Sequence, residues 1–498
     1  MRILAIDQGT TGTTALLLDG RARVVARGYA ELPQHFPKPG WVEHDGEEIW
    51  ASTLRALSEA LRRGGLSRGA GIDAVGITNQ RETTLLWDRK SGRPVARGIV
   101  WQDRRTSERC DALRRAGAEP GIARATGLRL DPYFSATKLE WLLDRVPRAR
   151  SRAKQGALAF GTVDSWLLWN LTGGRTHATD PTNASRTLLF HLRRLDWDET
   201  LLDRFGVSPA LLPEVRPSAG EFGVTRGVPG LADGIPILGV AGDQQAALFG
   251  QGCVTAGGMK NTYGTGCFLM LHTGARPVRP RAGLIATVAC GPRGEAAYAL
   301  EGSVFVAGAA IQWLRDGLGI LADAGESEAI ARSVPDTAGS HLVPAFTGLG
   351  APYWRPDARG IWCGLTRGTT RAHLVRAALE SIAQQSCDVV EAMRRESGVS
   401  IRSLRVDGGA TRNDFLMQLQ ADLLGIEVER PAMVESTALG AAYLAGIGAG
   451  FWGRREKAPE AAGKMSRFRP RIGAAARRRM RAGWAAAVAL IARDGRRS

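Results

Sequence analysis

The sequence has few cysteines and lysines, and it has no long hydrophobic run. None of the six cysteines among the 498 residues forms a Cys-x-x-Cys pair, so neither a disulfide framework nor a zinc site is expected. No apolar run reaches the roughly 18 residues that a membrane span requires. The first residues, MRILAIDQGTT, turn polar too early for a signal peptide. These absences predict a protein without a membrane span, in the reducing cytoplasm.

Positive charge is in excess, but its pattern does not favour nucleic acid as a partner. Lys+Arg is 66 and Asp+Glu is 49, a net charge of +17, yet only seven of the basic residues are lysine. This preference for arginine along the whole chain is typical of a compositional bias, and the densest runs, 477–479 and 496–497, lie near the C-terminus. A basic balance attracts anionic substrates in general. We therefore expect an anionic small molecule and no nucleic-acid partner.

Short apolar strands alternate with amphipathic helices along the chain. The first half of the sequence predicts strands over residues 3–6, 15–18, 24–26, 74–77 and 237–240. It also predicts a helix over 45–62. The second half begins again with strands at 267–271 and 404–406 and a long helix at about 370–393. The alternation predicts an α/β fold with a mainly parallel core sheet. We expect two similar lobes, residues 1–248 and 249–498, with peripheral C-terminal helices from about 454.

Three turns rich in glycine and hydroxyl residues follow predicted strands. They lie at 7–14 (DQGTTGTT), 263–266 (YGTG) and 407–413 (DGGATRN). Such turns present backbone N–H and O–H groups to phosphates, although each alone is also an ordinary turn. The Walker A pattern is absent. Because two turns lie in one lobe and one in the other, together they predict a cleft that holds the phosphates of a nucleotide from both sides.

Polar and aromatic residues near other strand ends predict a site for a small polyol. Asn79–Glu82 follows one apolar strand, and Asp243 follows another. Asp243 is either a helix N-cap or a general base at the strand's carboxyl end, where α/β sites lie. A carboxylate suits the removal of a proton from an alcohol that attacks a γ-phosphate. Trp101, Tyr133 and Phe268 are either core residues or a wall against the C–H edges of the polyol.

These motifs, together with longer blocks, resemble the FGGY family of carbohydrate kinases. The blocks are PKPGWVEHD, GITNQRETT, TGLRLDPYFS, TNASRT, AGDQQAALFGQ, NTYGTGCF, PAFTGLGAPYW and ERPAMVESTALGAAYLAG, at 37–45, 76–84, 126–135, 182–187, 241–251, 261–268, 344–354 and 429–446. The two signature regions of the family correspond to 133–145 and 360–380. The resemblance extends to about residue 470, and within the family the blocks are similar to those of members that phosphorylate glycerol.

The resemblance implies two actin-like (ribonuclease H-like) lobes with a nucleotide and substrate cleft between them. It implies ATP-dependent conversion of glycerol to sn-glycerol 3-phosphate, with Asp243 as general base and ATP and Mg²⁺ as cofactors. The implied substrate contacts are Thr10, Arg81, Glu82, Trp101, Tyr133, Asp243, Gln244 and Phe268. The implied nucleotide contacts are Thr10, Thr11, Gly12, Thr265, Gly308, Gln312, Gly409 and Asn413. Asp7 is implied to hold Mg²⁺ through water, in a cytoplasmic homo-oligomer (dimer or tetramer).

The chain departs from the family pattern in two places. Members commonly have Ser-Ser-Arg where this chain has Gly12, Thr13 and Thr14, so a phosphate-facing arginine is missing. Some bacterial members bind fructose bisphosphate on a glycine-rich loop with an arginine, whereas the corresponding loop here, 227–234, has Asp233 instead. Two alternatives stay open: a pentulose or hexulose kinase of the same fold, and a nonenzymatic actin-like scaffold that binds nucleotide.

Overall fold

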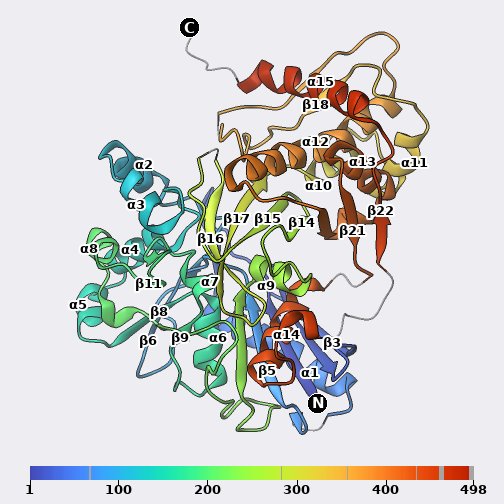
Figure 1. Cartoon of the computed structure of the whole chain (residues 1–498). Helices are drawn as coiled ribbons and strands as arrows, with labels where there is room; N and C mark the ends of the chain where they lie inside the picture. The colour runs from blue at the N-terminus through green and yellow to red at the C-terminus, as the bar shows by residue number, and fades with distance from the viewer. Residues whose placement is uncertain (67–68, 282, 356, 433–434, 459–464, 493–498) are drawn as a thin grey trace.

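The computed structural model describes residues 1–498 except 67–68, 282, 356, 433–434, 459–464 and 493–498 (Figure 1). A five-stranded sheet of order β13-β5-β1-β2-β3 lies in the lower part of the figure. Its strands are β1 (Arg2–Gln8), β2 (Gly12–Asp19), β3 (Val24–Glu31), β5 (Ala74–Asn79) and β13 (Ile237–Gly242). All five coincide with predicted apolar segments.

A seven-stranded sheet of order β16-β17-β15-β14-β20-β21-β22 lies above it. Its strands are β14 (Met259–Tyr263), β15 (Cys267–Gly274), β16 (Ile285–Cys290), β17 (Ala296–Val304), β20 (Ser403–Asp407), β21 (Glu427–Arg430) and β22 (Ser466–Phe468). Short two-stranded pairs are β4 (Glu43–His44) with β7 (Gly98–Ile99), β6 (Leu85–Asp88) with β8 (Leu158–Gly161), β9 (Ala178–Thr179) with β12 (Glu214–Val215), β10 (Phe190–His191) with β11 (Asp196–Trp197), and β18 (His341–Val343) with β19 (Ile361–Cys363).

The helices surround these sheets. They are α1 (Gly46–Arg63), α2 (Ser107–Arg115), α3 (Glu119–Thr126), α4 (Ser135–Arg145), α5 (Ala149–Lys154), α6 (Val163–Leu171), α7 (Pro181–Ala184), α8 (Glu199–Phe205), α9 (Asp243–Gly250), α10 (Gly308–Gln312), α11 (Ser327–Arg332), α12 (Arg371–Ser397), α13 (Asp414–Leu424), α14 (Ser436–Gly448) and α15 (Ala474–Ala492). Within the described ranges, no helix is both long and apolar enough to cross a membrane.

The two sheets share one topology, which confirms the prediction of two similar lobes. In the first sheet β1-β2 and β2-β3 are antiparallel, whereas β1-β5 and β5-β13 are parallel. In the second sheet β14-β15 and β15-β17 are antiparallel, and β14-β20 and β20-β21 are parallel. The prediction of a mainly parallel sheet was therefore wrong. The first two strands of each lobe are joined by a short turn, and strands that are joined in this way must pair antiparallel.

Side-chain alternation along β1 assigns each face of the first sheet to different helices. Leu4 and Ile6 belong to a buried cluster with residues of α1 and α6, whereas Ile3 and Ala5 belong to a cluster with residues of α9 and α14. Successive side chains of a strand point to opposite faces, so a strand buried on both faces is apolar throughout. Asp7 continues the Ile3–Ala5 series, and the helix α9 that covers this face begins at Asp243.

One helix of the second half of the chain, α14, packs against the first sheet. Helix α14 packs on β1, β5, β13 and α9, and it lies beside β5 and α1 in the lower part of Figure 1. The predicted boundary at 248/249 stays a prediction. The region from about 454 contains α15 but also β22, an edge strand of the second sheet that was expected to be helical.

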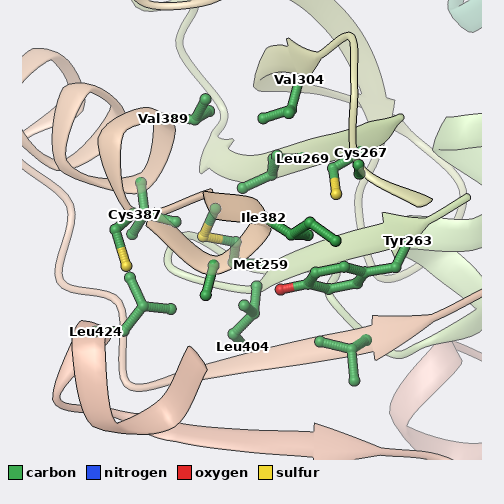
Figure 2. Close-up of a cluster of buried hydrophobic side chains, with 14 of the residues drawn as sticks. Met259, Tyr263, Cys267, Leu269, Val304, Ile382, Cys387, Val389, Leu404 and Leu424 are labelled. Carbon is green, nitrogen blue, oxygen red and sulfur yellow. The ribbon is translucent and has the colours of Figure 1, made fainter. Parts of the chain in front are cut away.

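The core of the second lobe lies between its sheet and α12. Figure 2 shows Ile382, Cys387 and Val389 of α12 with Leu269 and Leu404 of the sheet. Thr370 and His373 form a capping box at the start of α12, and Gly398, with φ +66°, ends it. The predicted helix at 370–393 is confirmed. This packing supports the sheet that carries β14, β15 and β17.

Candidate active site

A cavity of about 60 Å³ joins residues from both lobes. Its lining comes from the chain after β1, β5 and β13, from two connecting segments, and from β15 of the second sheet: Thr10, Arg81, Glu82, Trp101, Tyr133, Asp243, Gln244 and Phe268. These are the eight residues predicted to contact the substrate. A water needs about 10–15 Å³ of such volume, so the cavity holds about four to six water-sized spheres. That size suits a three-carbon polyol.

The strand order explains why these residues meet. Strands β1, β5 and β13 are adjacent and parallel, so their carboxyl ends meet at one edge of the sheet. The turn after β13 is held by Thr182, whose hydroxyl accepts the Gly242 N–H at 2.8 Å. Asp243 then opens α9. Glu82 adopts φ +62°, a left-handed conformation that is costly for this residue and is typical of functional sites.

Arg81 has hydrogen-bonding or ion-pair partners for both terminal nitrogens and for Nε. Nη1 donates to Glu301 Oε2 at 2.6 Å and to Gln245 Oε1 at 3.2 Å, and Nη2 donates to Glu301 Oε1 at 3.1 Å. A long bond of 3.4 Å joins Nη2 to the Tyr133 hydroxyl. Nε lies 3.2 Å from Asp243 Oδ1. Of the hydrogen bonds of Arg81, the long bond to Tyr133 is the weakest and the easiest for a substrate hydroxyl to replace.

Arg186 and Glu301 complete a buried charge network that sequence analysis missed. Arg186 Nε donates to Glu82 Oε1 at 2.6 Å, and its Nη2 donates to Glu301 Oε1 at 3.1 Å. The side chains of Arg81, Arg186, Glu82 and Glu301 are at most 2% exposed. Two arginines thus face two glutamates, and this pairing compensates charges that would be costly if buried alone. A signal existed: Glu301 is a lone carboxylate in an otherwise apolar strand, and Arg186 lies in the TNASRT block.

The electrostatics of the network act on its carboxylates in different directions. Burial alone would raise the pKa of Glu301, but Arg186 and Arg81 overcome it and hold the pKa at about 2. Burial raises the pKa of Asp243, and the Arg81 charge opposes the rise only in part. The side chain of Asp243 stays 29% exposed, towards the cavity that it lines. Asp243 is therefore a more basic carboxylate than usual that is open to a ligand, which suits a general base.

Aromatic rings form one wall of the cavity. Trp101 and Tyr133 meet edge to face, with their centroids 5.7 Å apart, and the Trp101 indole donates to Thr10 Oγ1 at 3.0 Å. Phe268 approaches from β15. Apolar rings beside charged groups suit a ligand with C–H edges and hydroxyls.

The surroundings of Asp7 fit a magnesium ion. Burial, together with the nearby carboxylates Asp243 and Glu435, raises its pKa to about 8. A divalent cation would relieve this repulsion, and carboxylate oxygens are the ligands that Mg²⁺ prefers. In the described part of the chain, no three His, Cys, Asp or Glu side chains form a direct metal cage.

Two of the predicted nucleotide turns, and the helix α10 that begins at Gly308, are in contact in the second lobe. The N–H of Gly308 donates to Gly264 O at 3.0 Å, which places α10 and Gln312 at its end against the Thr265 turn. A Cβ at Gly408 would lie 2.3 Å from Tyr263 O, so the third turn touches the same place. Gly409 faces open space, which leaves room for a ligand. The Asn413 side chain caps α13 by accepting the Leu416 N–H at 2.9 Å.

In the first lobe, the three positions that depart from the family pattern have different surroundings. Gly12 is buried at the start of β2, where a Cβ would lie 2.7 Å from Ala30 O. Thr13 bonds to the Ser52 hydroxyl in the core at 2.8 Å. Thr14 pairs with Asp7 in the β1–β2 ladder, so their side chains share one face of the sheet. An arginine at position 14 would therefore lie on the same face of the sheet as Asp7, and this chain lacks it. Thr11, one of the predicted nucleotide contacts, is exposed.

Two lobes with the same strand arrangement, a small cavity lined from both of them and a carboxylate directly after a strand of the first sheet are typical of a two-lobed kinase. The chain belongs to the FGGY family of carbohydrate kinases: the N-terminal domain of the family matches residues 2–250 and the C-terminal domain matches residues 259–449. The family membership and the two-lobed fold confirm the resemblance found in the sequence.

Its relatives make the comparison more specific. A glycerol kinase of Shewanella oneidensis is 55% identical over 487 residues, which is 98% of each chain. A glycerol kinase of Shewanella piezotolerans is 53% identical over 487 residues. The crystal structure of Plasmodium falciparum glycerol kinase with ADP superposes with a TM-score of 0.93 at 35% identity, over 98% of each chain. A xylulose kinase from Rhodospirillum rubrum, at 23% identity and a TM-score of 0.86, shares the fold over 98% of this chain and 99% of its own.

Proposed function

We propose that this chain is a glycerol kinase, which uses ATP and Mg²⁺ to convert glycerol to sn-glycerol 3-phosphate and ADP. The observation that carries the proposal is the cavity of about 60 Å³, which places a basic carboxylate and a charged pair beside aromatic rings. The relatives at 53–55% identity that cover nearly the whole chain support the same reaction.

Asp243 is the proposed general base. Its carboxylate takes the proton of a terminal hydroxyl while the oxygen of that hydroxyl bonds to the γ-phosphorus of ATP, and ADP leaves. Arg81 Nε, 3.2 Å from Asp243 Oδ1, orients the carboxylate. Asp7 would hold Mg²⁺ through water, and the bound ion would supply positive charge for the phosphates. A glycerol molecule that fills the small cavity leaves little room for water, which would compete with the alcohol as nucleophile.

The nucleotide binds, in this proposal, between the turns of the two lobes. Thr10, Thr11 and Gly12 offer groups from the first lobe. The second lobe offers Thr265, Gly308, Gln312, Gly409 and Asn413. Support comes from the contacts among the second-lobe turns and from the open space at Gly409. The solved structure with a TM-score of 0.93 contains ADP.

A coupled assay of ADP release over a panel of polyols and sugars tests the function. We expect turnover with glycerol and a kcat/KM for xylulose lower by at least about tenfold, because Trp101, Tyr133 and Phe268 confine the cavity. Equal kcat/KM values for the two substrates would favour a sugar kinase of the same fold. ATP binding without turnover on any alcohol would favour a nonenzymatic scaffold.

A homo-oligomer, dimer or tetramer, and a cytoplasmic location are further proposals. They rest on the resemblance to the family and, for the location, on cysteines that show no disulfide spacing. Light scattering after size exclusion measures the first, and cell fractionation measures the second.

A further inference from the structure

A fully buried lysine, which sequence analysis did not single out, lies behind the substrate cavity. Lys260 is the second residue of β14 and has no exposed surface. Its ammonium donates to Gln244 Oε1 and, at 2.8 Å, to Thr262 Oγ1. Lysine is rarely buried completely unless it has a partner that needs it. Its partner Gln244 lines the cavity next to the proposed base.

The lysine determines which way the Gln244 amide points. A lysine ammonium only donates hydrogen bonds, so it requires the carbonyl oxygen of the amide and excludes the NH₂ group from its side. The amide plane then directs Nε2 away from Lys260. The NH₂ donor of Gln244 therefore lies on the side that Lys260 does not occupy.

We propose that Lys260 is a positioning residue that fixes the Gln244 amide so that its NH₂ group donates to a hydroxyl oxygen of the substrate in the cavity. The inference rests on the proposed function, because it concerns the polyol that this cavity takes. A hydroxyl that accepts from Gln244 keeps its own proton free to donate to a carboxylate. The neighbouring carboxylate is Asp243, which also accepts the Gln244 backbone N–H at 2.7 Å.

The charges around Lys260 agree with an ammonium at this place. Burial lowers the pKa of Lys260, and the charges of Asp407 and Asp243 oppose the decrease. The charge of Arg81 also lowers the pKa of Lys260, whereas the charge of Glu301 raises it. Asp407, which is 5% exposed, accepts from Gln251 at 2.8 Å and from the Ser436 hydroxyl. Three carboxylates and one guanidinium thus surround the ammonium of Lys260.

A double-mutant cycle tests whether Lys260 acts through Gln244. Lys260→Met removes the donor but keeps the length of the side chain. We expect the KM for glycerol to rise about three- to tenfold in Lys260→Met and similarly in Gln244→Ala, with kcat within about threefold. The double variant should have the KM of Gln244→Ala within about twofold, because the second change then removes nothing further. Multiplicative effects in the double variant would overturn the proposal.

Two further variants separate positioning from a structural role. In Gln244→Glu the carboxylate still accepts from Lys260 but gives the cavity no N–H, so we expect the KM for glycerol to rise at least as much as in Gln244→Ala. An unchanged KM in Gln244→Glu overturns the proposal even if Lys260→Met fails to fold. Thr262→Val is the matched control: it removes the other partner of the ammonium and should leave the KM for glycerol within about twofold.

The wild-type chain separates this inference from the function on which it rests. If it does not phosphorylate glycerol, the proposed function fails. If it does so and the cycle is multiplicative, only the role of Lys260 fails.

Discussion

Replacing Gly440 by alanine should destabilise the protein, although the same change favours helix formation. Gly440 lies within α14 and faces α9, the helix that begins at Asp243. A Cβ at this position would lie 1.9 Å from the carbonyl oxygen of Ala246, and real Cβ contacts essentially never fall below 3.0 Å. The neighbour is backbone and cannot rotate away. The two helices would therefore have to separate by about 1 Å.

The magnitude follows from two opposing effects. An alanine in a helix interior is favoured over glycine by about 1 kcal/mol. Overpacking a buried contact costs about 1–3 kcal/mol, and a clash between two backbones belongs at the upper end. The expected net loss is about 2 kcal/mol. With an unfolding entropy of about 2.1 cal/mol/K per residue, a chain of 498 residues has about 1 kcal/mol/K, so the melting temperature should fall by about 2 °C.

Gly121→Ala provides the matched control. Gly121 lies within α3, is exposed, and has no atom within 4 Å of the position of a Cβ. The same helix preference applies there without a clash, so its melting temperature should stay unchanged or rise. Differential scanning fluorimetry of the wild type and both variants at one heating rate measures the difference. A Gly440→Ala protein that melts at or above the wild-type temperature would refute the packing argument.

Four other outcomes are expected. Asp243→Asn should keep its affinity for glycerol but lose at least about 10²–10⁴-fold in kcat, since it removes the base; a variant with half the wild-type kcat would exclude that role. The kcat/KM of the wild type should fall with decreasing pH as Asp243 is protonated, and the fall should begin at a higher pH than for an ordinary aspartate, because burial raises its pKa; a profile that stays flat down to the ordinary aspartate value of 3.8 would contradict this. Glu301→Gln should cost about 3–5 kcal/mol of unfolding free energy in denaturant titrations, because it leaves two buried arginines with less negative charge; Glu328→Gln, in a surface pair, should cost less than about 1 kcal/mol. Fructose bisphosphate at millimolar concentration should not inhibit, since Asp233 accepts the Gly227 N–H at 2.7 Å and adds negative charge to the loop; saturable inhibition that disappears in Arg226→Ala would show the opposite.

Much of the fold was predictable because its signals are local. The strands of both sheets that surround the site are short apolar runs, and α12 carries its capping residues and a terminal glycine in its own sequence. The direction of the strands was less predictable. Whether a strand pairs parallel or antiparallel depends on its connection, and the expected parallel character gave way to hairpins in both sheets.

The cavity residues were predictable for a related reason. The carboxyl ends of adjacent parallel strands meet at one edge of the sheet, so the polar residues after β1, β5 and β13 could be predicted to lie close together. The sequence alone left Trp101, Tyr133 and Phe268 as either core aromatics or a wall of the site, and the resemblance to the family favoured the wall. All of them line the cavity.

The sequence by itself determined the secondary structure around the site, the glycine turns and the acid at the strand end, because each depends on neighbouring residues. Only the tertiary structure decided what those groups do to one another. Arg81 meets Glu301 across 220 positions of the chain, and Gln251 meets Asp407 across 156. The pKa of Asp243 and the direction of the Gln244 amide follow from such contacts. Burial and long-range charge act through space, and a linear pattern records neither.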